Sequence, residues 1–212
     1  MCTYIAIINS IVIASAVLQE RFGYDEVQAG FFFTLPYLVA AVTAPPVGFF
    51  VSKVGHRMTV TVVGSMLMII AHAMQLFIPD CDDRCWYSVV PYIFLGLSYS
   101  TYAVVLWGSI PYMVEARTLG TAFGICTVFQ NLGTVIAPPV MGYIQDSTVD
   151  NPYGTYFYVE IFFTIVSTAA FCLNLWVYAW DKKNRSALLQ SMAPLEEFEK
   201  YTSLKMTAVQ VS

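Results

Sequence analysis

Six long apolar stretches dominate the sequence and most constrain its fold. They cover residues 2–18, 27–51, 58–78, 87–114, 120–144 and 155–180. A helix needs about 20 apolar residues to cross a bilayer, and the stretches are close to or above that length. Their apolar residues are continuous rather than alternating, which disfavours a transmembrane β-barrel. The sequence therefore predicts an all-α polytopic membrane protein with six transmembrane helices in residues 1–180.

Composition agrees with a chain that lies in lipid. Of its 212 residues, 58% are hydrophobic and 11% are charged, whereas an average soluble domain has about 25% charged residues. The net charge of −4 favours no nucleic-acid partner. The first stretch has a competing interpretation as a cleaved signal peptide, because small residues lie near its end. No Lys or Arg precedes that stretch, so the basic start of a signal peptide is missing and we expect a membrane helix.

Basic residues predict the orientation of the helices. The loops after the first, third and fifth helices carry only Arg21 and Arg84. The other loops and the start of the polar tail, residues 181–212, carry Lys53, Arg57, Arg117, Lys182, Lys183 and Arg185. Lys and Arg favour the cytosolic side of a membrane, so we expect both termini and the tail to be cytosolic.

The second and fifth stretches share the phrase Ala-Pro-Pro-Val near their C-terminal ends, from Ala44 and from Ala137. Because these helices run in opposite directions, the two copies should lie at opposite membrane faces. That arrangement is typical of the inverted 3+3 repeat of transporters. We expect the prolines to bend or break their helices, and Gly48 and Gly142 to let neighbouring helices approach closely. Simple packing kinks explain the local residues equally well.

The segment after the first proline pair, GFFVSKVGHR (Gly48–Arg57), resembles the cytosolic signature of the major facilitator superfamily. Ser52 stands where that signature has an acidic residue. The resemblance implies a conformational latch that uses Gly48, Lys53, Gly55 and Arg57. In the loop after the fourth helix, we expect Glu115 and Arg117 to form a gating or capping cluster.

A longer likeness covers about residues 4–180. LGLSYS, the Leu106–Trp107 pair, LGTAFG and QNLG, all within residues 95–133, resemble the lysosomal dipeptide transporters of the same superfamily, as do residues 21–30 and 156–163. The resemblance implies the C-terminal six-helix half of such a carrier. It also implies export of dipeptides, cationic ones included, from lysosome to cytosol, and a glycosylated lysosomal membrane partner. Neither an enzymatic activity nor a cofactor is expected.

A carrier of this superfamily has two six-helix halves around a central cavity. We therefore expect this chain to be a truncated or partial gene product, or else to be completed by a partner chain. A homodimer is a further possibility. On its own, such a half would expose the polar wall of its cavity to lipid, which is costly.

Candidate substrate-binding residues come from the helices that the resemblance places around the cavity, which are the first, second, fourth and fifth. In the fourth helix, Ser98, Tyr99 and Tyr102 should share one face, with Trp107 two turns further on the same side. Aromatic rings with polar tips suit a peptide or a cationic side chain. The full set of candidates is Trp107, Tyr99, Tyr102, Gln130, Asn131, Asn9 and Tyr37. An aromatic packing stripe, and hydrogen bonds between helices for the amides, are the alternatives.

Two ionisable residues, His72 and Glu160, lie within membrane spans, which makes them candidates for function. Both fall on helices that the resemblance makes peripheral, so we expect a structural role for them. The cavity helices then hold no evident proton-coupling residue. A uniporter fits that pattern, although the other half could supply the coupling group.

Two further patterns lie outside the predicted helices, and two alternative functions stay open. Cys81 and Cys85 flank a short loop on the non-cytosolic side, where a disulfide is possible. Tyr201 and Leu204 in the tail form a tyrosine-based sorting pattern of the kind that directs membrane proteins to lysosomes. The alternatives to a dipeptide carrier are a non-transporting structural subunit and a carrier of a sugar or organic anion.

Overall fold

The computed structural model describes residues 2–80, 85–150 and 153–184. Six long helices make up the fold: α1 (Cys2–Phe22), α2 (Glu26–Val54), α3 (Arg57–Phe77), α4 (Val90–Ser109), α5 (Leu119–Ser147) and α6 (Thr155–Asn184). Three short 3₁₀ turns flank α4: η1 (Trp86–Val89), η2 (Ile110–Tyr112) and η3 (Ala116–Thr118). All six helices are long and apolar enough to cross a membrane. The predicted all-α, six-helix membrane fold is confirmed.

Local sequence explains where several helices begin and end. Asp25 caps α2, because its carboxylate accepts a hydrogen bond from the Gln28 backbone N–H at 2.9 Å. Gly55 ends the same helix with φ 75°, a conformation that favours glycine. The apolar stretch that ends at residue 114 is not one helix, since α4 stops at Ser109 and the 3₁₀ turn η2 follows with Pro111 in its first positions.

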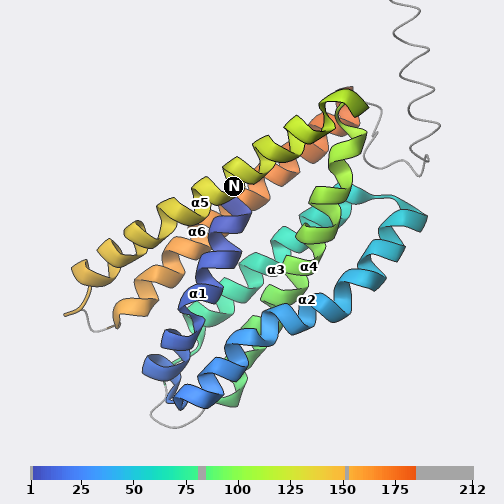
Figure 1. Cartoon of the computed structure of the whole chain (residues 1–212). Coiled ribbons are helices and arrows are strands. Elements are labelled where there is room, and N and C mark those ends of the chain that lie inside the picture. The colour runs from blue at the N-terminus through green and yellow to red at the C-terminus, as the bar shows by residue number, and fades with distance from the viewer. Residues whose placement is uncertain (1, 81–84, 151–152, 185–212) are drawn as a thin grey trace, which may run out of the picture.

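The paired prolines lie inside continuous helices, so the expected break is absent. Pro45 and Pro46 are within α2, and Pro138 and Pro139 are within α5. A proline removes only its own backbone donor, and membrane helices tolerate that loss when neighbouring groups compensate. The two helices run in opposite directions, which puts the two phrases near opposite ends of the bundle, as expected for an inverted repeat (Figure 1).

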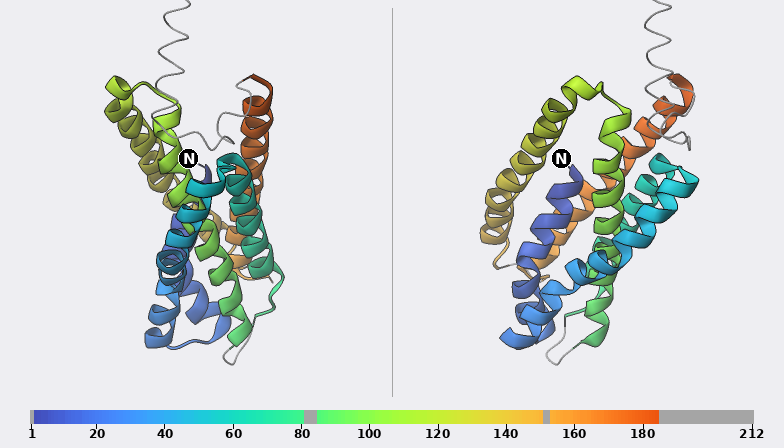
Figure 2. Two further views of the ribbon diagram at one scale, coloured as in Figure 1. Left: turned by 90° about the vertical axis from the view of Figure 1, so that its right-hand side faces the viewer. Right: turned by 45° about the vertical axis from the view of Figure 1, so that its right-hand side comes forward.

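The helices pack around α4 and α1. Helix α4 packs chiefly on α2 and α3, and α3 packs on α6, while α1 contacts α2, α5 and α6. Helix α1 is the most enclosed of the six and carries much of the apolar core, including Ile7, Ile11, Leu18 and Phe22. Helices α2 and α5 are mostly exposed. At one end of the bundle, the corner between α4 and α5 stands apart from the C-terminal end of α6 (Figure 2).

The close helix approaches occur at other glycines than the two expected. A Cβ atom added to Gly96 of α4 would lie 2.7 Å from the Pro36 carbonyl oxygen of α2, and one added to Gly64 of α3 would lie 2.8 Å from the Thr101 side chain of α4. A Cβ at Gly48 would make only an ordinary contact at 3.5 Å, and one at Gly142 would meet nothing within 4 Å. The expectation for Gly48 and Gly142 is therefore wrong within this unit.

Candidate functional site

Tyr37 of α2 and Tyr99 of α4 form an aromatic pair near the middle of their helices. Their ring centroids lie 5.9 Å apart at an interplanar angle of 88°, an edge-to-face arrangement. Tyr37 is 39% exposed and Tyr99 is partly buried, so the pair borders an accessible face of the unit. The close approach of Gly96 to α2 positions the pair, because Gly96 contacts Pro36 next to Tyr37 and lies one turn from Tyr99.

Trp107 lies further along α4, at the end of the bundle where the chain begins. Its indole Nε1–H donates a hydrogen bond to the Tyr4 hydroxyl of α1 at 2.9 Å. Its ring is also parallel to that of Phe123 in α5, with centroids 5.8 Å apart and an interplanar angle of 5°. Trp107 is therefore partly buried between side chains of two other helices.

The expected common face of Ser98, Tyr99 and Tyr102 is wrong. Ser98 is fully buried and donates a hydrogen bond to the Gly64 carbonyl of α3 at 2.8 Å. Tyr102 is 3% exposed, and its hydroxyl accepts a hydrogen bond from the Asn174 amide of α6. These residues tie α4 to α3 and α6, and Tyr102 does not reach the accessible face that Tyr99 borders.

The amide candidates lie in different surroundings. Asn131 is exposed on α5, and its neighbour Gln130 is partly buried. The Gln130 Oε1 atom is buried and has no hydrogen-bond partner in the described part of the chain, which is costly unless a ligand or another helix supplies a donor. Asn9 is 2% exposed, and its amide donates to the Ile5 carbonyl of its own helix at 3.0 Å. Asn9 is thus enclosed within the unit.

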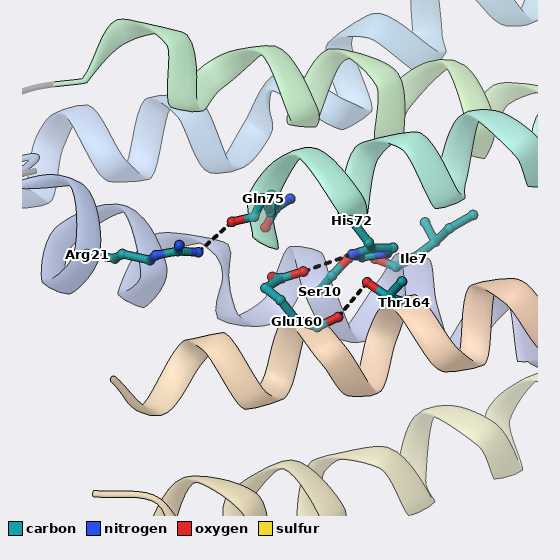
Figure 3. Close-up of polar contacts among 7 residues, drawn as sticks. All are labelled: Ile7, Ser10, Arg21, His72, Gln75, Glu160 and Thr164. Carbon is teal, nitrogen blue, oxygen red and sulfur yellow. Dashed lines mark hydrogen bonds and ion pairs between the residues drawn. The ribbon is translucent and has the colours of Figure 1, made fainter. Parts of the chain in front are cut away.

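His72 of α3 and Glu160 of α6 form a buried hydrogen-bonded pair, with 3.1 Å between Nδ1 and Oε2. Their side chains are 0% and 1% exposed and point toward one another, with Ser10 of α1 beside them (Figure 3). The His72 ring also stacks on Phe163 at 5.3 Å. The pair joins α3 to α6 away from the Tyr37–Tyr99 face, as its expected structural role requires.

Arg57, the first residue of α3, connects that helix to the turn after α4. Its guanidinium donates a hydrogen bond to the Tyr112 hydroxyl at 2.9 Å and lies 4.1 Å from the centroid of that ring. Lys53 lies over the Phe49 ring at 4.7 Å. Glu115 and Arg117 form an exposed ion pair at 2.8 Å. Arg57 therefore holds a neighbouring segment without an acidic residue at position 52.

Arg21, counted above among the loop charges, instead lies in the last turn of α1 with its side chain 8% exposed. Its guanidinium donates to the Gln75 and Ile78 carbonyls, each at 2.6 Å, and pairs with Asp80. Carbonyls at the C-terminal end of a helix lack partners within that helix. Arg21 thus caps α3 from a neighbouring helix, and Figure 3 shows it reaching toward Gln75.

Two predictions concern residues that lie wholly or partly outside the ranges that the structure describes. Cys85 is buried and disulfide-bonded, while Cys81, its expected partner, lies outside the described residues, as do Tyr201 and Leu204 of the tail. The disulfide pairing and the sorting pattern stay predictions.

Sequence reasoning missed Tyr4, Phe123 and Tyr112. The first lies in a stretch read only as an apolar span, and Phe123 lies within the LGTAFG motif, where nothing marks it as a partner of Trp107. Tyr112 lies in a 3₁₀ turn that follows α4. The sequence marks each of the three only as an aromatic residue near a helix end. Such residues are too common in membrane helices for this feature to identify a site.

These observations define a class of protein: an integral membrane protein with the six-helix architecture of half a carrier. The major facilitator superfamily model matches residues 1–208, and the chain belongs to this superfamily. It is similar to proteins named lysosomal dipeptide transporter MFSD1. It is 28% identical to the Danio rerio protein over 190 residues, 90% of this chain and 39% of that protein. It is 26% identical to the Homo sapiens protein over 199 residues, 94% of this chain and 40% of that protein. The chain thus spans about two fifths of the length of these relatives.

Proposed function

We propose that this chain is part of a carrier that moves dipeptides, cationic ones included, out of the lysosome by alternating access. The names of the relatives support the substrate and the compartment. The observation that carries the proposal is the Tyr37–Tyr99 pair, which borders an accessible face in the middle of the bundle. Substrates of such carriers bind near the bilayer midplane between the two halves.

The chemistry of this face suits the side chain of a small peptide. Aromatic rings attract both apolar groups and cations, and tyrosine hydroxyls add hydrogen-bonding capacity. Gln130 and Asn131 on α5 supply amide groups for the peptide backbone, and the unpartnered Gln130 Oε1 would accept a hydrogen bond from an N–H group. This half would bind the neutral parts and the side chain of the dipeptide.

The proposed mode of transport is uniport. Apart from their end turns, α1, α2, α4 and α5 carry no Asp, Glu, Lys, Arg or His. His72 and Glu160 lie in the spans but are enclosed against each other. Within the helices that the structure describes, no Asp, Glu, Lys, Arg or His side chain is then placed to exchange a proton with the cavity during transport.

The complete carrier needs partners for the exposed faces of α2 and α5. We propose that a further six-helix half, in the same gene product or in a second chain, covers them; a second copy of this chain is the alternative. We also propose that both termini are cytosolic, and that a glycosylated lysosomal membrane protein accompanies the carrier, as the resemblance implies.

Uptake of radiolabelled dipeptides into proteoliposomes tests this proposal. The protein is purified with the chain that completes it, and Tyr37→Ala and Tyr99→Ala are compared with Tyr143→Ala, which alters a 74% exposed tyrosine of α5. We expect saturable uptake that the first two variants weaken at least several-fold and the third leaves unchanged. Saturable uptake of a sugar or organic anion, without uptake of dipeptides, would show that the proposed substrate class is wrong and that the protein carries that other solute. A folded protein that transports none of these solutes would favour the structural-subunit alternative.

A further inference from the structure

Trp107 links α4 to two helices, α1 and α5, with which α4 otherwise shares few contacts. Helix α4 packs mainly on α2 and α3, and α5 packs on α1 and α6. The Trp107 indole of α4 contacts both α1, through the hydrogen bond to Tyr4 at 2.9 Å, and α5, through the parallel stack on Phe123 at 5.8 Å. We call these three residues the indole bridge.

The indole bridge lies at one end of the bundle. Tyr4 is in the first turn of α1, Trp107 is two residues before the end of α4, and Phe123 is one turn inside α5. Trp107 is eight residues from Tyr99, about 12 Å along a helix at 1.5 Å per residue. The bridge is thus displaced by that distance from the Tyr37–Tyr99 pair that borders the middle of the bundle.

Two sets of contacts hold the connection between α4 and α5, which lies at the same end of the bundle as the indole bridge. It contains the two 3₁₀ turns η2 and η3. Arg57 holds η2 through Tyr112, with a hydrogen bond of 2.9 Å, and the indole bridge fixes the helices on either side of the connection. Helix α5 is the least enclosed of the six helices and packs on α1 and α6, so the indole bridge adds the contact that fixes it relative to α4.

We propose that Trp107 is a positioning residue that holds α5 against α4 and α1, and that it does not contact the transported solute. The hydroxyl of Tyr4 orients the indole plane, and the plane in turn positions Phe123 and the start of α5. An offset aromatic stack changes the equilibrium between α5 held against Trp107 and α5 released from it by roughly two- to ten-fold. The positioning role itself does not depend on the proposed function. Only its effect on transport rests on that function, because movement of α5 would then set the transport rate.

The test first measures the position of α5 without any transport. Spin labels are placed on Leu106 of α4 and Val128 of α5, which are 37% and 64% exposed, after the free cysteines have been replaced by serine. Distance distributions are measured by pulsed electron resonance in the complete carrier. Phe123→Leu removes the stack, and Phe129→Leu is the matched control, because Phe129 lies on the same helix and is 53% exposed.

We expect the Phe123→Leu distribution to broaden or lengthen and that of Phe129→Leu to match the unsubstituted protein. Tyr4→Phe, which removes only the acceptor of the indole N–H, should give an intermediate change. Thermal unfolding of each variant shows whether the protein is still folded. A conservative Trp107→Phe variant keeps a stacking ring but loses the indole N–H, so its distribution should match that of Tyr4→Phe. Unchanged distances in Phe123→Leu would overturn the proposal.

Transport kinetics give the second readout. A positioning role predicts that Phe123→Leu and Tyr4→Phe lower the maximal dipeptide uptake rate several-fold with little change in KM. A several-fold increase in KM with unchanged label distances would instead make Trp107 part of the solute site and overturn the proposal. If the unsubstituted protein transports no dipeptide, the proposed function fails, and the label distances alone still decide the role of Trp107.

Discussion

The buried pair of His72 and Glu160 gives the sharpest stability prediction. The two side chains are 0% and 1% exposed and 3.1 Å apart, inside a helix bundle where water does not compensate a lost partner. Removing one partner leaves the other polar group buried and unpaired, which costs about 1–3 kcal/mol. We therefore expect Glu160→Leu alone and His72→Phe alone each to lower the free energy of unfolding by about that amount.

The double variant His72→Phe/Glu160→Leu separates the pair from its packing. Phenylalanine keeps a ring against Phe163, on which His72 stacks at 5.3 Å. With both polar groups gone, neither is left unpaired, so the double variant should lose less than the sum of the singles by about 1–3 kcal/mol. Glu160→Gln, which retains an acceptor for the imidazole, should cost less than Glu160→Leu.

Unfolding by titration with sodium dodecyl sulfate in mixed micelles measures these free energies. The reasoning is refuted if the two single losses are each below about 1 kcal/mol, or if they simply add in the double variant. Additive losses would mean that the two side chains contribute independently to packing and that their pairing does not hold α3 to α6.

Three further predictions concern the packing and orientation of the helices. Gly96→Ala should destabilise the protein by about 1–3 kcal/mol, since its Cβ would meet the Pro36 backbone at 2.7 Å, whereas Gly142→Ala should be neutral or slightly stabilising in the same unfolding titration; equal losses would contradict the helix contact. Arg21→Met should cost at least about 1 kcal/mol more than Asp80→Asn, because Arg21 also serves two carbonyls that cap α3; a smaller loss than for Asp80→Asn would argue against capping. A protease site added at the C-terminus should be cleaved from the cytosolic side of intact lysosomes, and protection there would reverse the predicted orientation.

The fold was predictable because lipid imposes a strong pattern. Six apolar stretches of spanning length leave few alternatives to six helices, and the residues that cap α2, Asp25 and Gly55, have local roles that depend little on the rest of the chain. The order of six spans also predicts that α2 and α5 run in opposite directions, which puts the two copies of the repeated phrase near opposite ends of the bundle.

The details of the site were less predictable, because they depend on which faces of the helices meet. Helical periodicity alone places Tyr99 and Tyr102 near each other. Tyr102, however, lies on the side that packs on α3 and α6, where its hydroxyl accepts a hydrogen bond from Asn174. Likewise Gly96 rather than Gly48 meets a neighbouring helix closely. The sequence shows that a glycine is present in a helix, but only the packing of a second helix against it decides whether the two helices approach closely there.

The contacts of Trp107 illustrate the same limit. Resemblance selected Trp107 as a solute contact, yet its partners Tyr4 and Phe123 are 103 residues away along the chain in one case and in the next helix in the other. No local pattern links three such positions. The assembled helices therefore suggest a different role from the one that the motif implies.

The central claim, that this chain is part of a solute carrier rather than a structural subunit, is tested most directly by counterflow. Proteoliposomes that contain the protein with its completing chain are loaded with an unlabelled cationic dipeptide and placed in a trace of the labelled one. A carrier exchanges the two, so we expect a transient accumulation of label that Tyr99→Ala reduces. Label that equilibrates no faster than in protein-free vesicles, with the protein folded, would contradict the claim.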